Sequence, residues 1–481
     1  MVLGFAFTFL FTRRVSIEEY SVWVMISKYV GYLIMPSVIY TNWIPRDISR
    51  GNNTSRTGFY SSIIFGLVTM PLYALIIFES SKNFNQPLIP LLVSILILPL
   101  EYLITIQQSI VSGYAPQKNG YINFAMKAGQ LASGLLLIGS LAMGLTGAVI
   151  AVVIGKLLSA LLGLYLNRGI LKKAEFNKPT LVSWLRSSWL HLMSIAYSLI
   201  FTLDVVFVRA LYGSEIPIAY YGLCISIVSL ASFAGVVSTS VYPRIISKSN
   251  LDDIKDAIWL VLLLSMPVFF LLLFFAEPAC ALFGVKYLPM AQALRIFSFS
   301  AIIQALSSLL NTAYIGLDQF DRNHLTTKSL YKSTIFKSNL TLLIVNGAYL
   351  ALVSAVSFSG LPADQLIVSW GVILSIAYLI QFSVFYFLIK RDFGISLELA
   401  SQLKDVIIFS VSAIPIAVVS YYWAIPLEIN FQTMLLNAFP PVLISAILYV
   451  GMLFALSAKF RSIVRSTIRI LLNNIASSNK P

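Results

Sequence analysis

The residues whose chemistry stands out in this sequence are ionisable side chains that interrupt long apolar stretches. Inside a membrane such a group is costly, so it usually faces a cavity, a partner of opposite charge or an ion. Bases in that position would bind an anionic cargo, and acids would pair with a base or bind a cation. The set comprises Lys28, Glu101, Lys127, Lys156, Asp204, Arg209 and Arg295.

The basic members of this set suit an anionic headgroup that must cross an apolar core. Lys156 lies near the middle of its apolar stretch, Lys28 and Arg295 in the outer halves of theirs, and Lys127 in an inner third. A diphosphate offers several acceptor oxygens, and Arg holds phosphate through two parallel hydrogen bonds. We predict that these four side chains, together with Arg209, line a cavity that binds a diphosphate. The alternative for Lys28, Lys127 and Arg295 is that each side chain extends to the membrane surface.

The two acids, Glu101 and Asp204, leave two uses open. Either one pairs with a buried Lys or Arg, or it binds the H⁺ or Na⁺ that drives a transport cycle. No cofactor and no metal site is predicted, because the two Cys and two His residues form no cluster with metal-ligand spacing.

The composition predicts a membrane protein. Of 481 residues, 58% are hydrophobic and 11% are charged, with a mean hydropathy of +0.86, whereas a soluble protein is about one quarter charged. The net charge of +14 fits basic cytoplasmic loops better than a nucleic-acid partner. We predict an all-α polytopic membrane protein.

Apolar stretches of about 20 residues, enough to cross a bilayer, predict about fourteen transmembrane helices. They cover residues 1–12, 20–43, 59–79, 87–113, 121–142, 146–167, 187–212, 217–242, 256–276, 289–316, 336–357, 365–389, 404–424 and 434–457. The first is too short to span, so we expect a clipped first helix, whether through truncation or through the choice of a start codon.

The basic residues orient these helices. The even-numbered loops and the C-terminal tail hold 24 of the 33 Lys and Arg residues, and the opposite loops hold 4. This asymmetry predicts a multi-pass protein of the cell membrane with both termini cytoplasmic. In the tail, Arg461, Arg465 and Arg469 recur four apart, which predicts an interfacial helix attracted to anionic lipid or, alternatively, a solvated helix end.

Two short segments predict an internal repeat. "WIPRDIS" at 43–49 and "VYPRIIS" at 241–247 both place Pro-Arg after an apolar stretch. Six predicted helices separate the copies, and because that number is even, the halves form a parallel pseudo-two-fold repeat. We predict two six-helix lobes, 1–178 and 179–395, followed by helices 13 and 14 in 396–481. Locally, each Pro would end a helix, and Arg46 and Arg244 would anchor the helix ends.

Three segments resemble the oligosaccharidyl-lipid/polysaccharide branch of the multidrug/oligosaccharidyl-lipid/polysaccharide (MOP) exporter superfamily. They are "RRVSIEEYSVW" (13–23), "WIPRDISRG" (43–51) and "LDVVFVRALYGSEIPIAYYGL" (203–223). The last is the most specific, because Asp204, Gly213 and Tyr221-Gly222 match an Asp in helix 7, a Gly-containing loop and a Tyr-small pair opening helix 8. The resemblance covers nearly the whole chain. The short first helix and the long loop 317–337 depart from it.

The resemblance implies a flippase that moves a polyprenyl-linked sugar between leaflets by alternating access of two lobes around a cationic cavity. Its partners would be that lipid and the surrounding membrane lipids, and we expect a monomer. A multidrug/cation antiporter of the same superfamily is the nearer alternative, since Glu101 and Asp204 would suit cationic drugs. A membrane glycosyltransferase or polymerase would need a substantial outer loop with acidic residues, whereas the outer loops 277–288 and 425–433 are short. We therefore predict a transporter and not an enzyme.

Overall fold

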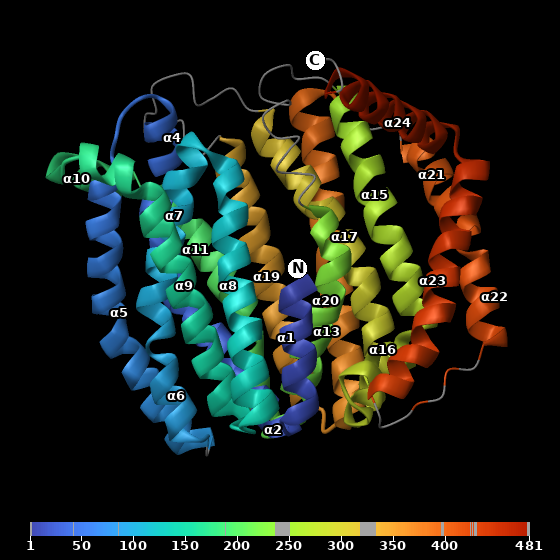
Figure 1. The fold of residues 1–481 in the computed structure, drawn as a ribbon, viewed down its shortest axis with the longest axis horizontal. Helices are drawn as coiled ribbons and strands as arrows, with labels where there is room; N and C mark the ends of the chain where they lie inside the picture. Colours follow the sequence, from blue (N-terminus) through green and yellow to red (C-terminus); the bar gives the residue numbers. More distant parts are fainter. Residues whose placement is uncertain are drawn as a thin grey trace. The chain divides into compact units, whose positions relative to one another are not determined.

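The computed structural model describes residues 2–41, 43–84, 86–187, 189–235, 251–317, 333–395, 399–423, 425, 427 and 431–478. These residues form helices and turns without a strand (Figure 1), which confirms the all-α prediction. Eleven helical segments are long and apolar enough to cross a membrane, so the chain is a multi-pass membrane protein.

The eleven segments coincide with eleven of the predicted spans. They are Ile17–Ser49, Ser55–Phe84, Leu88–Tyr114, Gly144–Lys173, Met193–Tyr212, Ile254–Phe274, Val285–Gly316, Thr334–Ser357, Ala363–Phe393, Gln402–Tyr422 and Gln432–Leu456. The predicted spans at 1–12, 121–142 and 217–242 overlap the shorter helices α1 (Val2–Arg14), α8 (Asn119–Gly134) and α13 (Ile216–Ser232). Residues 236–242 of the last span lie outside the described residues. The total of fourteen remains a prediction.

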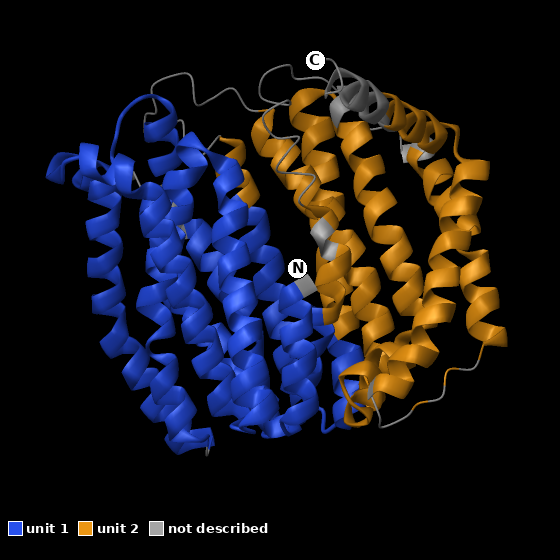
Figure 2. Cartoon of the chain, viewed as in Figure 1, with its two compact units in different colours: residues 1–226, 339–370 blue, residues 227–338, 371–481 orange. Residues whose placement is uncertain are grey.

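The chain divides into two compact units, shown in different colours in Figure 2. Unit 1 comprises Met1–Ser226 and Asn339–Trp370, and unit 2 comprises Ile227–Ser338 and Gly371–Pro481. The predicted lobes at 1–178 and 179–395, with 396–481 beyond them, remain a prediction.

Unit 1 contains the N-terminal helices and also includes parts of two later helices. Its remaining helices are α2 (Ile17–Ile34), α3 (Val38–Thr41), α4 (Ile44–Ser49), α5 (Ser55–Phe84), α6 (Leu88–Ser94), α7 (Ile97–Tyr114), α9 (Gly144–Lys173), α10 (Lys178–Ser187), α11 (Trp189–Thr202), α12 (Asp204–Tyr212), most of α19 (Thr334–Ser357) and the start of α20 (Ala363–Phe393).

Unit 2 contains the later helices. They are α15 (Leu251–Phe274), α16 (Ala276–Phe283), α17 (Ala291–Gly316), the remainder of α20, α21 (Leu399–Ser412), α22 (Ile414–Tyr422), α23 (Phe431–Leu456) and α24 (Ala458–Ser478). The predicted basic helix of the tail is α24, which begins two residues after α23 ends, and Lys459 near its start forms an ion pair with Asp256 of α15 at 2.6 Å. Its attraction to anionic lipid remains a prediction.

Helix α2 begins at a capping box. The Ser16 hydroxyl accepts the Glu19 N–H at 3.1 Å, and the Glu19 carboxylate accepts the Ser16 N–H at 3.1 Å. This reciprocal pair satisfies two backbone donors that would otherwise lack partners. Glu19 also accepts the N–H of Leu145 at the start of α9, at 3.2 Å. One side chain therefore fixes the ends of two helices that line the site described below.

Helices α8 and α9 approach each other closely because glycine occupies the contact. A Cβ at Gly155 would lie 2.5 Å from the carbonyl oxygen of Met126. Membrane helices lack a hydrophobic force between them and associate through such small-residue contacts. Because Lys156 follows Gly155 and Lys127 follows Met126, this contact also determines where the two lysines lie.

The first Pro-Arg motif differs from the prediction in one respect. Pro45 lies in the first turn of α4 and does not end the preceding helix, a position where the missing N–H of proline costs no hydrogen bond. Arg46 lies in the last turn of α4, 5.9 Å from the Trp43 ring. The second motif, with Arg244, lies outside the described residues, so the repeat itself remains a prediction.

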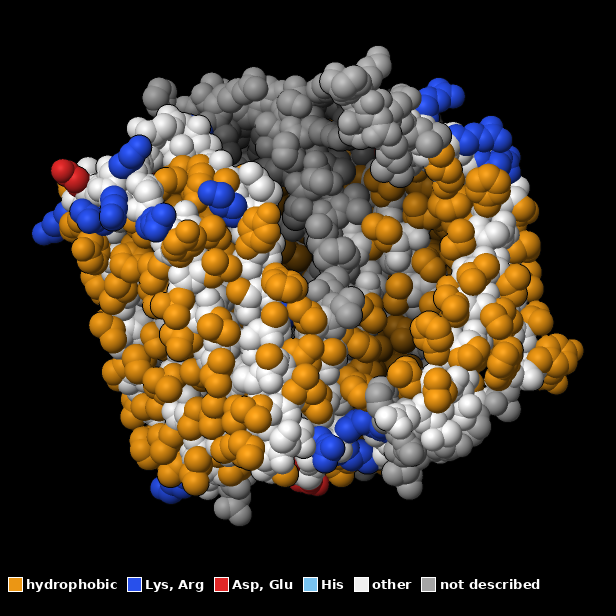
Figure 3. All heavy atoms as spheres, in the orientation of Figure 1, with side chains coloured by type: hydrophobic (Ala, Val, Ile, Leu, Met, Phe, Trp, Pro, Cys, Tyr) orange, Lys and Arg blue, Asp and Glu red, His pale blue; other side chains and the backbone are white. Residues whose placement is uncertain are grey.

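The outer face of unit 1 is apolar. Leu67, Val68 and Leu75 of α5 are 59%, 60% and 63% exposed, which suits contact with lipid tails. In Figure 3, hydrophobic side chains cover the length of this helix, and Lys and Arg gather near α10 at one end. An apolar band along the helix with basic side chains toward its end is typical of a membrane protein.

Candidate functional site

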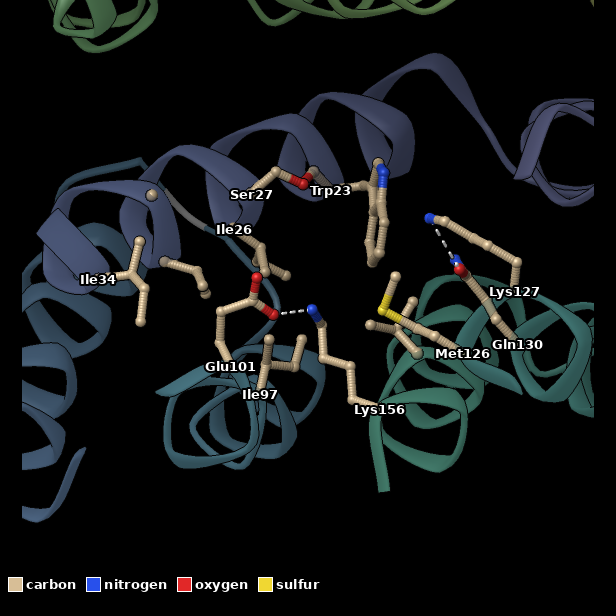
Figure 4. A pocket seen from close by; sticks show the side chains of 13 residues that line it. Trp23, Ile26, Ser27, Ile34, Ile97, Glu101, Met126, Lys127, Gln130 and Lys156 are labelled. Atoms are coloured by element: carbon tan, nitrogen blue, oxygen red, sulfur yellow. Dashed lines mark hydrogen bonds and ion pairs between the residues drawn. The ribbon is translucent and has the colours of Figure 1, made fainter. Parts of the chain in front are cut away.

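A cavity within unit 1 brings together three of the predicted residues, Glu101, Lys127 and Lys156 (Figure 4). Its volume is about 260 Å³, slightly below the roughly 300 Å³ at which typical small-molecule sites begin. Helices α2, α7, α8 and α9 line it. The lining residues are Trp23, Ile26, Ser27, Val30, Gly31, Ile34, Ile97, Glu101, Met126, Lys127, Gln130, Val152 and Lys156.

Glu101 of α7 and Lys156 of α9 form an ion pair on one side of the cavity. Their side chains are 29% and 15% exposed, so both are largely removed from solvent but still reach the cavity. Because both side chains reach the cavity, water there can solvate either charge, and the attraction within the pair is weaker than in a fully buried pair. The structure thus joins the predicted base nearest the membrane midplane to a predicted acid.

Lys127 of α8 lies at the other side of the cavity. Within the described chain its ammonium donates to the Gln130 side-chain oxygen at 3.4 Å, a long contact with a neutral partner. Figure 4 shows Trp23 and Met126 between the Lys127–Gln130 pair and the Glu101–Lys156 pair. The cavity therefore presents two ammonium groups and one carboxylate across a mainly apolar interior.

Aromatic contacts position Trp23 on the cavity wall. Its ring centroid lies 5.6 Å from that of Phe11 and 6.4 Å from that of Phe7, both on α1. Edge-on and tilted arrangements at these distances are favourable. The short helix α1 thus supports the residue that separates the two charged sides of the cavity.

A second cluster within unit 1 surrounds Asp204, the first residue of α12. Its carboxylate has no solvent exposure and receives the Lys28 ammonium of α2 at 3.3 Å. It also accepts the Tyr349 hydroxyl of α19 at 2.7 Å and the Val205 N–H at 2.8 Å. We call Lys28, Asp204, Tyr349, Trp370 and Tyr221 the Asp204 cluster.

Two aromatic residues extend the Asp204 cluster to further helices. The Trp370 indole N–H of α20 donates to the Tyr349 hydroxyl at 2.7 Å. Tyr221 of α13 stacks on Trp370 with ring centroids 4.2 Å apart, and the Lys28 ammonium lies 5.2 Å from the Tyr221 ring. Tyr349 and Trp370 are not among the residues predicted from the sequence. Neither residue carries a charge that marks it in the sequence, and Trp370 lies five residues inside the predicted span 365–389, near the interfacial positions that tryptophan usually occupies.

The Asp204 cluster gives a physical account of the segment that carries the family resemblance. Gly213 ends α12 with a φ of 79°, a left-handed conformation that favours glycine. A Cβ at Gly222 would lie 2.2 Å from a methyl group of Val24 on α2, so only the smallest residue permits this approach of α13. The matching positions thus serve packing and charge pairing within unit 1.

Arg209 and Arg295 lie in other surroundings. Arg209 is buried and donates to the Glu215 carboxylate at 2.7 Å and to the carbonyl oxygens of Gly213 at 2.8 Å and Phe84 at 3.2 Å. Burial raises the pKa of Glu215, in the turn after α12, and the charge of Arg209 lowers that pKa in part. In unit 2, Arg295 pairs with Glu277 at 2.5 Å and donates to the Leu273 carbonyl oxygen at 3.0 Å.

The predicted cationic residues therefore separate into different environments. Only Lys127 and Lys156 are among the residues that line the cavity of unit 1. A place for Lys28, Arg209 and Arg295 in a cavity between lobes remains a prediction. Within the described ranges, no group of three or more His, Cys, Asp or Glu residues could hold a metal ion.

Comparison with known proteins identifies the fold. No protein-family model matches the chain, and no curated protein matches its sequence. Among solved structures, the inward-facing conformation of a multidrug resistance MATE family transporter of the MOP superfamily has a TM-score of 0.61 at 12% identity, covering 80% of this chain and 93% of that chain. Lipid II flippase MurJ in an inward closed conformation has a TM-score of 0.60 at 16% identity, covering 96% and 97%.

A third structure shows a related transporter in another state. The outward-facing conformation of a multidrug resistance MATE family transporter has a TM-score of 0.52 at 13% identity, covering 82% of this chain and 96% of that chain. All three proteins are named as transporters or flippases, and the chain shares their fold. This shared fold agrees with the fold that the resemblance to the MOP exporter superfamily implies.

Proposed function

We propose that the protein is a flippase that moves a polyprenyl-(di)phosphate-linked sugar from the inner to the outer leaflet of the cell membrane. It would act as a monomer with both termini cytoplasmic, by alternating access of two lobes. The observation that carries this proposal is the cavity in which Lys127 and Lys156 face an apolar interior.

The charges of the cavity favour an anion. Two ammonium groups and one carboxylate leave one net positive charge among its lining residues. In a region of low dielectric constant an isolated excess charge is unfavourable, and an anion entering the cavity would offset it. Phosphate oxygens accept hydrogen bonds from ammonium groups readily, so a lipid phosphate or diphosphate headgroup suits the site.

The exposed apolar side chains suit the remainder of the cargo. A polyprenyl tail needs no enclosed path, because it can stay in the hydrocarbon region beside helices such as α5 while the polar headgroup crosses through the protein. The cavity volume of about 260 Å³ suits the diphosphate part of the headgroup and excludes a long lipid chain. A small charged cavity is therefore compatible with a cargo that has a long lipid tail.

The second candidate is a multidrug/cation antiporter. Its support is the MATE transporter at a TM-score of 0.61, together with the acids Glu101 and Asp204. Against it, Glu101 is paired with Lys156 and Asp204 with Lys28. A cationic drug would have to displace a tethered lysine from either carboxylate, which weighs against a cationic cargo.

A vesicle assay separates the two candidates. The full chain is reconstituted in liposomes, and movement of a fluorescent polyprenyl diphosphate-linked sugar between leaflets is compared with ethidium transport. We expect movement of the lipid-linked sugar, reduced at least tenfold by Lys156→Gln. The matched control is Lys82→Gln, in the last turn of α5 and outside the cavity lining, which should retain full activity. Ethidium transport without sugar-lipid movement would contradict the proposal.

A further inference from the structure

The Glu101–Lys156 ion pair influences how the cavity can bind a doubly charged headgroup. Lys156 already has a carboxylate partner in the cavity, whereas Lys127 donates to a neutral amide. An arriving anion therefore meets one ammonium that has no anionic partner among the described residues and one that shares its charge with Glu101. The carboxylate is the resident counterion of the site.

The balance of charge depends on the headgroup. A phosphodiester carries one negative charge, which matches the single net positive charge of Lys127, Lys156 and Glu101. A diphosphate diester carries two, so its binding would leave one excess negative charge in a mainly apolar cavity. Two like-charged groups that share such a site favour protonation of one of them. A diphosphate diester does not protonate near neutral pH, so the carboxylate is the group that can take the proton.

We propose that Glu101 takes up one proton when the cavity binds a doubly charged diphosphate headgroup, and that it takes up none when the headgroup carries a single charge. This inference rests on the proposed function, because it assumes that the cavity receives the headgroup of the cargo. With the proton on Glu101, both ammonium groups are available to the two phosphates, and the total charge of the occupied cavity is zero.

The neighbours of Glu101 support this assignment. The charged groups that line the cavity with it are Lys156 from α9 and Lys127 from α8. The residues that α2 contributes to the lining carry no charge, and Lys28 on that helix is paired with Asp204. With 29% of its side chain exposed, Glu101 can exchange a proton with water, whereas the fully buried Asp204 carboxylate cannot do so directly.

The test is calorimetric titration of the detergent-solubilised full chain with P1,P2-dimethyl diphosphate, which carries two charges, and with dimethyl phosphate, which carries one. Neither probe titrates near neutral pH. Repeating each titration in buffers of different ionisation enthalpy counts the protons exchanged. We expect about one proton taken up per diphosphate bound and none for the monophosphate. Where Glu101 is ionised in the free protein, affinity for the diphosphate should fall about tenfold per pH unit as pH rises.

Two variants identify the group that takes the proton. In Glu101→Gln, proton uptake should disappear and the affinity for the diphosphate should become independent of pH, with a gain of about tenfold or more at neutral pH. Glu79→Gln, an exposed α5 residue hydrogen bonded to Asn83 at 3.1 Å, should behave like the wild type. Proton uptake that persists in Glu101→Gln would assign the proton to another group, such as Lys127, and would overturn the inference.

The remaining outcomes separate this inference from the proposed function. Absence of binding by either probe, or diphosphate binding without proton uptake, overturns the inference even if vesicles still move the lipid-linked sugar. Proton-coupled diphosphate binding that vanishes in Glu101→Gln supports the inference even if the vesicles fail to move the lipid, in which case only the proposed flippase activity fails.

Discussion

The cavity and the Asp204 cluster are both built on a lysine paired with an acid within unit 1, yet their surroundings differ. Asp204 has no solvent exposure, and its carboxylate accepts from Lys28, Tyr349 and Val205. Glu101 is 29% exposed at a cavity, and its partner Lys156 faces the same space. A saturated, buried carboxylate stabilises a helix arrangement, whereas a partly exposed pair beside a cavity can change partners when a ligand arrives.

The largest loss of stability is expected from breaking the buried Lys28–Asp204 ion pair. Lys28→Ala leaves the Asp204 carboxylate without its cation in a fully buried position, and loss of one partner of such a pair costs about 3–5 kcal/mol. The free energy of unfolding in detergent, followed by denaturant titration, should fall by that amount. The double variant Lys28→Met/Asp204→Leu should recover much of the loss, because it leaves no unpaired charge. A Lys28→Ala protein as stable as the wild type would show that the cluster does not depend on the ion pair.

A smaller loss of stability is expected from disturbing the close packing of α13 against α2, which brings Tyr221 to the Asp204 cluster. In Gly222→Ala the added methyl would lie 2.2 Å from a methyl group of Val24, and overpacking of this kind costs about 1–3 kcal/mol. Thermal unfolding should occur at a lower temperature. Gly347→Ala on α19 is the matched control, because nothing lies within 4 Å of the added Cβ. Equal melting temperatures for the two variants would contradict the close packing of α13 against α2.

A smaller effect concerns the indole of Trp370. Trp370→Phe keeps an aromatic ring near Tyr221 but removes the N–H that donates to Tyr349 at 2.7 Å. Loss of one hydrogen bond typically costs about 1 kcal/mol. Denaturant unfolding should show this modest loss, while anion binding in the cavity should be unchanged. A large loss of diphosphate binding would instead connect the Asp204 cluster to the ligand site.

The smallest stability effect is expected at the cavity itself. Glu101→Gln removes the charge partner of Lys156, but both side chains reach the cavity, where water can solvate the ammonium. We expect a change in unfolding free energy within about 1 kcal/mol, far below that of Lys28→Ala. If the two variants were equally destabilised, the distinction between an exchangeable pair and a structural pair would be wrong.

The sequence predicted more of the fold than of the site. Long apolar stretches predicted eleven segments that are helices capable of spanning a membrane, because span length is a local property. The unusual charges were also visible, since any ionisable residue inside an apolar stretch stands out. Which lysine meets which acid was not predictable, because the partners Lys28 and Asp204 are 176 residues apart, and Lys156 and Glu101 are 55 apart. Such pairs depend on helix packing.

The local geometry at several positions also could not be predicted from the sequence. Pro45 was expected to end a helix, but it lies in the first turn of α4, because proline fits either boundary. Gly222 was recognised as a small residue beside Tyr221, but the neighbour that requires it, Val24, lies on a helix 198 residues earlier. Tyr349 and Trp370 carry no charge that would mark them in the sequence. Tyr349 donates to the Asp204 carboxylate, and Trp370 donates to the Tyr349 hydroxyl.

The most direct test of the central claim is whether a headgroup occupies the cavity. Ser27 lines it and is exposed there, so the thiol of a Ser27→Cys variant should react with a cationic methanethiosulfonate reagent. Cys224 and Cys280 are buried, and burial raises the pKa of the Cys280 thiol to about 12, which keeps the background low. We predict that P1,P2-dimethyl diphosphate slows this labelling at least fivefold and that Lys156→Gln abolishes the protection. Labelling at the same rate with and without saturating diphosphate would contradict binding in this cavity.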